Sequence, residues 1–257
     1  MGLTEQLDAY LPFGMVTTKQ RLLARGMSIY SVDNALRSKK LTALAVGVYA
    51  RAGLPVNWQG ITGSVQRMAD QPVLVGGLSA LELSGFGHYL SSAKTKTIHL
   101  YSPHKLPAWL NKLDPLICFE WHGTKKLWPQ SVLDQRRYHL EHRWRDDLPP
   151  ILLSCPEKAC LEMLAGLPEK ISFEHADELM QGMTSLSPKK LQELLCECRH
   201  VKVKRLFLWL AQRQNYPWFK KLKLDEFDLG KGKRVIAKQG KLESHYQITV
   251  PEHLHGS

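Results

Sequence analysis

The chain has 257 residues, 44% of them hydrophobic and 23% charged, a balance that is typical of globular proteins and excludes disordered or collagen-like chains. Its net charge of +11 favours a polyanionic partner, and the excess of lysine and arginine is concentrated near the two ends, in residues 1–55 and 201–257. No apolar run is long enough to span a bilayer and no signal peptide is recognisable, so we expect a cytoplasmic protein with no contact with membranes. The cysteines number five, an odd and sparse set, so we expect reduced thiols.

Three short helices are predicted at the start of the chain. They cover about residues 4–11, 17–25 and 29–39. Gly26 is expected to end the second helix, and Ser28 is expected to cap the third.

The third helix has an apolar stripe and is followed by a small hairpin. Ile29, Val32 and Leu36 recur at helical spacing, so we expect all three to face a core. Residues 41–44 and 48–51 are predicted to pair as two short strands. Two helices, a glycine-containing turn, a third helix and a hairpin are together typical of a winged helix-turn-helix.

The opposite face of the third helix is polar, as a DNA-reading helix requires. Tyr30, Ser31, Asn34 and Arg37 lie on it; an asparagine can pair bidentately with adenine, and an arginine with guanine, in the major groove. The alternative is a helical unit that docks another protein through a solvated polar face. The basic residues expected to contact phosphates are Lys19, Arg21, Lys39, Lys40 and Arg51.

The middle of the chain is predicted to be mixed. Residues 73–75, 98–101 and 116–121 favour strands, and residues 78–83 favour a short helix. The glycine pair at 76–77 could hold an anion at the start of that helix, but it lacks the spacing of a nucleotide-binding motif, which favours a tight turn.

Four helices are predicted in the C-terminal half, at about residues 155–164, 172–183, 187–198 and 201–211. Ser154 is expected to open the first of them in a capping box.

The last of these helices begins with a run of cations. Lys202, Lys204 and Arg205 oppose the helix dipole there, so a negative partner is expected nearby. We favour the acidic helices of residues 151–200 as that partner, with an anionic ligand or a partner protein as the alternative.

A second basic cluster lies near the C-terminus. Lys231, Lys233 and Arg234 alternate with two glycines, which favours a basic surface loop over a backbone nest for phosphate. Residues 235–238 and 245–250 are predicted to form a hairpin after it.

No enzyme motif is recognisable, and we expect neither catalysis nor a cofactor nor a bound metal. Asp114 and Glu120 lack the lysine spacing of a nuclease site. Cys196, Cys198 and His200 would suit zinc chemically, but residues two apart point in different directions on a helix, and no second ligand cluster is present.

Seven stretches, taken in chain order, form a recognisable set; they are residues 11–19, 47–49, 75–89, 106–109, 155–164, 201–211 and 229–234. Together they resemble the AbiEi family, the antitoxins of type IV toxin–antitoxin systems that are linked to abortive infection of phage-attacked bacteria. The resemblance covers nearly the whole chain.

This resemblance implies an α+β fold, with a winged helix-turn-helix in residues 1–55 and a larger mixed α/β antitoxin domain in residues 56–257, subdivided near residue 150. It implies a transcriptional autorepressor that binds inverted repeats in its own promoter and counters a nucleotidyltransferase-like toxin without a stable complex. Residues 42–46 of the hairpin are uncharged where the family often has polar or basic residues, so no strong groove contact is expected there. The DNA-contacting positions that it implies are Lys19, Gln20, Tyr30, Ser31, Asn34 and Arg37.

A second hypothesis comes from a different class of function. The basic C-terminal region could dock an acidic protein or a nucleic acid, which would make the chain a protein-interaction module.

Overall fold

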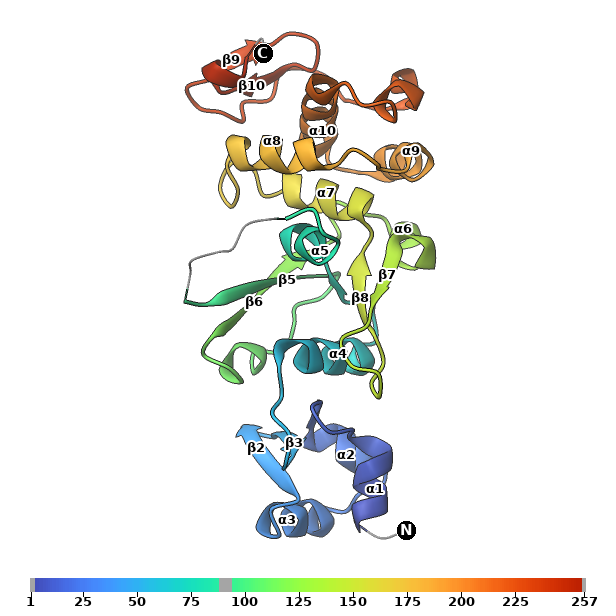
Figure 1. The fold of residues 1–257 in the computed structure, drawn as a ribbon, viewed down its shortest axis with the longest axis vertical. Coiled ribbons are helices and arrows are strands. Elements are labelled where there is room, and N and C mark those ends of the chain that lie inside the picture. Colours follow the sequence, from blue (N-terminus) through green and yellow to red (C-terminus); the bar gives the residue numbers. More distant parts are fainter. Residues whose placement is uncertain (1–2, 88–93, 256–257) are drawn as a thin grey trace. The chain divides into compact units, whose positions relative to one another are not determined.

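The computed structural model describes residues 3–87 and 94–255 (Figure 1). His88 and Tyr89, which end the third of the seven family-like stretches, lie outside these ranges. Among the described helices, none is both long and apolar enough to cross a membrane. The chain divides into two compact units: unit 1 is Met1–Leu74, Ser91–Trp121 and Glu141–Leu152, and unit 2 is Val75–Leu90, His122–Leu140 and Leu153–Ser257.

The N-terminal elements of unit 1 form a winged helix-turn-helix, as predicted (Figure 1). The strands form an antiparallel sheet in the order β1-β3-β2, in which Val16 pairs with Ala50. The first of these strands is too short to be recognised in the sequence. In chain order the elements are α1 (Leu3–Tyr10), β1 (Val16–Thr18), α2 (Lys19–Ala24), α3 (Ile29–Arg37), β2 (Leu41–Ala45) and β3 (Val48–Arg51).

Helix α3 begins where the sequence predicts and packs through small side chains. The Ser28 hydroxyl accepts a hydrogen bond from the Ser31 amide at 3.0 Å. Val32 and Ala35 are fully buried in a core that includes residues of α1, α2 and the wing. The expectation that Ile29 is buried is wrong, because this side chain lies in the first turn, beyond the edge of the core, and is 57% exposed.

Helix α4 (Trp58–Met68) follows the winged helix and was not predicted. Its sequence signal is the cap residue Asn57, whose side chain accepts from the Gly60 amide at 2.9 Å. The helix packs on the winged helix by close backbone approach, since a Cβ at Gly60 would lie 1.9 Å from the Gly14 carbonyl oxygen. The Val16 amide also donates to the Ser64 hydroxyl at 2.9 Å.

A five-stranded sheet has the strand order β6-β5-β4-β8-β7. Strands β4 and β8 are parallel, and Val75 pairs with Leu153. The three strands predicted from the sequence are present. The bounds are β4 (Leu74–Val75), β5 (Lys96–Ser102), β6 (Ile117–Gly123), β7 (His139–His142) and β8 (Ile151–Ser154).

Unit 2 is mainly helical (Figure 1). It is built around α7, of which every residue from Glu157 to Leu164 is buried. The four predicted C-terminal helices are present. The α-helices are α5 (Gly77–Leu83), α6 (Gln130–Leu133), α7 (Pro156–Leu164), α8 (Phe173–Gly182), α9 (Pro188–Glu197) and α10 (Val201–Gln214). The described single turns of 3-10 helix are η1 (Leu110–Lys112), η2 (Arg136–Tyr138), η3 (Phe219–Lys221), η4 (Leu224–Glu226) and η5 (Glu252–Leu254).

A fully buried ion pair lies inside unit 2. The Lys158 Nζ and Glu162 Oε1 atoms are 2.7 Å apart, and neither side chain has any exposed surface. Glu162 also accepts from the Gly77 amide and the Trp128 indole, so the buried charges are hydrogen-bonded as well as paired. Ser154 does not cap α7, which corrects the predicted capping box: the N-cap residue is Cys155, and the Ser154 hydroxyl accepts from the Lys158 Nζ at 3.0 Å.

The C-terminal hairpin differs from the prediction in its first strand. The paired strands are β9 (Lys241–Glu243) and β10 (Ile248–Val250), and residues 235–238 are not a strand of it. The turn between β9 and β10 has no glycine or proline, and its residue with a positive φ, of 54°, is Gln247. The usual sequence signals of a turn are therefore missing, and the prediction places the turn too early in the chain.

The contact between α4 and the winged helix predicts opposite effects at two glycines one turn apart. Gly60→Ala forces α4 away from Gly14 and is expected to destabilise the fold by about 1–3 kcal/mol, the usual cost of overpacking. Thermal unfolding followed by circular dichroism measures this.

Gly63→Ala is the matched control for that measurement. Its added methyl would meet Ile151 and Met15 side chains at 3.5 and 3.6 Å, which is ordinary contact. It is expected to stabilise the protein by up to about 1 kcal/mol through helix propensity. Equal changes in stability for the two substitutions would contradict the close approach of Gly60 to the Gly14 carbonyl.

Candidate nucleic-acid interface

The exposed face of α3 presents three side chains capable of contacting bases. Tyr30, Asn34 and Arg37 are exposed, with Tyr30 at 72%, and they recur at the i, i+4, i+7 spacing of one helix face. The burial of Val32 and Ala35 on the opposite side keeps these three directed outward. This face can therefore enter a groove without rearrangement of the core.

Ser31 is engaged at the start of the same helix. It is half-buried, and its hydroxyl lies 2.8 Å from that of the cap residue Ser28. This bond supports the helix N-terminus and uses only part of the hydrogen-bonding capacity of the Ser31 hydroxyl.

The positive charges around α3 are unequally available. Lys39 and Lys40 are exposed, as is the neutral Gln20, and the Lys40 Nζ donates to Thr4 at 2.9 Å. Lys19 lies 3.8 Å from the Asp33 carboxylate and is partly neutralised by it.

Two predicted phosphate contacts are held inside the protein instead. Arg51 pairs with Asp8 and lies 3.8 Å above the Phe13 ring, with 11% of its side chain exposed. Arg21 donates to the carbonyl oxygens of Arg67 and Met68 at the end of α4. Both guanidinium groups are therefore occupied within unit 1, and we leave Arg21 and Arg51 out of the interface.

The tip of the wing and the strand that leads to it, residues 42–46, are uncharged and partly exposed. Thr42 and Ala43 are exposed, and Val46 at its tip is fully exposed. Such side chains can lie against a sugar-phosphate backbone, but they do not attract it electrostatically.

The cations at the start of α10 are mostly interior. Lys204 and Arg205 are buried, and Lys202 is half-buried and donates to the carbonyl oxygen of Leu167. Burial lowers the pKa of Lys202. The structure thus corrects two expectations. Buried Arg205 and Lys204 cannot meet an external anion, and backbone carbonyls, not carboxylates of the acidic helices, accept the hydrogen bonds of Lys202 and Arg205.

Arg205 organises the glycine loop that follows. Its guanidinium donates to the carbonyl oxygens of Leu229, Gly230, Gly232 and Gln247, at 2.6 to 3.1 Å. The loop therefore turns carbonyls, not amides, toward its centre, which is the opposite of a phosphate nest. The three exposed cations of this loop are Lys231, Lys233 and Arg234.

The cysteines and carboxylates that the sequence offers for a metal or nuclease site differ in their environments. Cys196 is exposed, whereas Cys198 is buried, and this burial raises the pKa of the Cys198 thiol to about 11. Asp114 accepts from the Leu116 amide at 2.8 Å, while the Glu120 carboxylate lies 3.6 Å from His99.

Two family models match the chain. Residues 3–92 match the model described as "Transcriptional regulator, AbiEi antitoxin N-terminal domain". Residues 95–251 match "Transcriptional regulator, AbiEi antitoxin, Type IV TA system". The chain belongs to the AbiEi antitoxin family. This AbiEi protein is thus a member of a family of transcriptional regulators from type IV toxin–antitoxin systems, as its resemblance implied.

A solved structure shares the fold. The RV2827C protein from Mycobacterium tuberculosis is 18% identical to this AbiEi chain and superposes on it with a TM-score of 0.50. The match covers 96% of the AbiEi chain and 89% of the RV2827C chain. At this identity the similarity shows the fold alone. No curated protein matches the chain.

The Arg205 cluster predicts that the last basic loop depends on one buried guanidinium. Arg205→Met removes four hydrogen bonds and leaves carbonyl oxygens unsatisfied, so it is expected to destabilise unit 2 by about 2–4 kcal/mol. Hydrogen exchange of residues 229–234 should accelerate.

Lys231→Ala is the control, since an exposed loop cation usually changes stability by no more than about 0.5 kcal/mol. A stable Arg205→Met protein with an unchanged loop would show that the cluster is incidental.

Proposed function

We propose that this antitoxin represses its own operon by binding DNA. Residues 1–55 bind inverted repeats in its own promoter, and residues 56–257 counter a nucleotidyltransferase-like toxin in the cytoplasm without a stable complex. The protein acts by binding and performs no catalysis. The observation that supports this most strongly is the exposure of Tyr30, Asn34 and Arg37 on one face of α3.

Each side chain has a distinct part in this proposal. Asn34 pairs with an adenine edge and Arg37 with a guanine edge, because these side chains match the donors and acceptors of those bases in the major groove. Lys39, Lys40 and Gln20 contact the backbone and set the register of the helix on the duplex. Lys19 adds a weaker contact, since Asp33 shares its charge.

Substitutions on α3 test the DNA-binding proposal. Asn34→Ala and Arg37→Ala are each expected to weaken binding to the promoter duplex by about 1–3 kcal/mol, because each removes a bidentate base contact. Fluorescence anisotropy with the promoter and with a scrambled duplex measures this, and the scrambled duplex should show a smaller loss.

Arg136→Ala, an exposed arginine of η2 outside the winged helix, is the control and should bind normally. Unchanged affinity in both α3 variants would contradict the proposal. If binding were instead lost on joint substitution of Lys231, Lys233 and Arg234, the second hypothesis would replace it, with the exposed C-terminal loop as the nucleic-acid contact.

The two proposed activities should separate by residue. A double Asn34→Ala, Arg37→Ala variant is expected to lose repression of a promoter reporter but still to protect cells that express the cognate toxin, because both substitutions lie on the surface of α3 alone. Reporter output and growth after toxin induction measure the two activities. Simultaneous loss of protection at equal protein level would contradict the division of labour between residues 1–55 and 56–257.

A further inference from the structure

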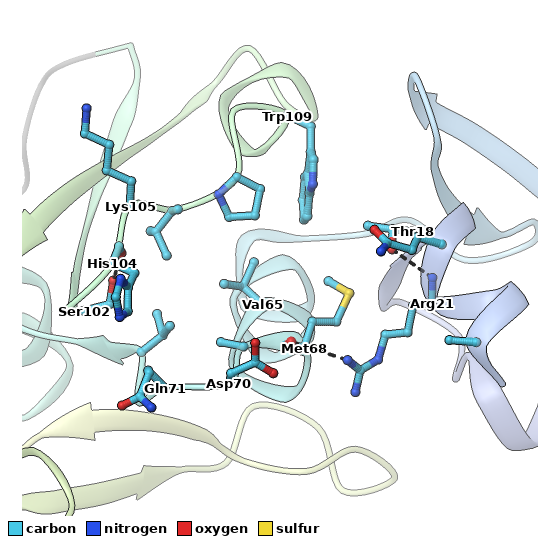
Figure 2. Close-up of a pocket in the computed structure, with 16 residues that line it drawn as sticks. Thr18, Arg21, Val65, Met68, Asp70, Gln71, Ser102, His104, Lys105 and Trp109 are labelled. Carbon is cyan, nitrogen blue, oxygen red and sulfur yellow. Dashed lines mark hydrogen bonds between the residues drawn. The ribbon is translucent and has the colours of Figure 1, made fainter.

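Unit 1 contains a cavity of about 600 Å³ that neither the DNA-binding proposal nor the antitoxin role uses. Its walls are α2 of the winged helix, the end of α4 with the residues after it, and the segment that follows β5 (Figure 2). A volume of this size is within the range of pockets that hold small molecules.

The broad surfaces of the cavity are apolar. Figure 2 shows the indole of Trp109 projecting into it, with Val65 and Met68 across from the ring. Trp109 is half-buried, so part of its aromatic surface is accessible to an occupant. A half-accessible indole facing a thioether and an aliphatic wall favours a flat aromatic body.

The polar groups at the edge have both signs. Arg21 is a cation whose guanidinium donates to the Arg67 and Met68 carbonyls. Asp70 is an exposed carboxylate on the same lining, and Lys105 is a second, exposed cation there. A neutral ring with donors and acceptors along its edge can hydrogen-bond to groups of either sign.

We propose that this cavity binds a purine base or nucleoside. The bicyclic ring stacks on Trp109, matching the bicyclic indole in area. Asp70 accepts from ring N–H or amino groups, and Arg21 donates to a ring carbonyl or ring nitrogen.

An occupant also touches the DNA-binding module. The cavity is lined by Thr18, Gln20 and Arg21, and Lys19 beside them lies 3.8 Å from Asp33 of α3. Arg21 would be shared between the ligand and the α4 carbonyls that now hold it. Purine binding therefore changes operator affinity, and operator binding changes purine affinity by the same factor. This coupling rests on the proposed DNA-binding function, but purine binding itself does not.

Titration calorimetry of the full chain tests the ligand, with adenosine and guanosine as probes and cytidine, benzoate and benzylamine as comparisons. One purine nucleoside should bind saturably and more tightly than the three comparisons. Trp109→Ala should lower the affinity for this nucleoside about tenfold or more, because the base loses the ring on which it stacks. Trp109→Phe, which keeps an aromatic ring, should lower it much less. Asp70→Asn should weaken binding of the preferred purine more than binding of the comparison compounds.

Trp58→Ala is the matched control, because Trp58 is a half-buried tryptophan of the same unit that does not line the cavity. Circular dichroism confirms that each variant is folded. Absence of saturable binding by either purine at millimolar concentration, equal binding by Trp109→Ala, or tighter binding of benzoate or benzylamine would overturn the proposal.

Promoter binding with and without the purine then separates the two claims. A shift in operator affinity that is present in the wild type and absent in Trp109→Ala supports the coupling. Purine binding with an unchanged operator affinity overturns the coupling, while the proposed purine site remains supported. If the protein bound no promoter DNA at all, the proposed function would fail while the calorimetric result would still decide the purine site.

Discussion

The burial of two small side chains, Val32 and Ala35, sets the orientation of α3, on which the proposed DNA interface depends. Both are inaccessible to solvent, so the helix cannot rotate without exposing valine and placing polar groups in the core. The face with Tyr30, Asn34 and Arg37 is therefore presented to solvent by packing.

A second constraint is the use of backbone carbonyls to hold cations. Arg21 is anchored at the end of α4 and Lys202 by the Leu167 carbonyl. Arg205 is held by three carbonyls of the C-terminal loop and by that of Gln247. These groups contribute to the net charge of +11 but not to an attractive surface for DNA. The free positive charge is smaller and lies at particular sites, such as Lys39 beside α3 and Lys231 in the C-terminal loop.

The sequence predicts local features well and tertiary contacts poorly. Caps such as Ser28 and periodic apolar residues are encoded within one turn of helix, so the winged helix and the four C-terminal helices are recognisable. Helix α4 is missed because Gly60 and Gly63 weaken its periodicity, although they allow its close packing. For the site, a polar face is readable from spacing, but the internal partners of Arg21, Arg51 and Arg205 come from distant segments and leave no local pattern.

The most direct measurement of the central claim is methylation interference on the promoter duplex, because methylation of guanine N7 blocks contacts in the major groove only. If α3 reads DNA through Arg37, methylated guanines in each half of the inverted repeat should prevent wild-type binding, and Arg37→Ala should lose sensitivity at one guanine per half-site. Interference confined to adenine N3 in the minor groove, or a pattern that Arg37→Ala leaves unchanged, would contradict the account.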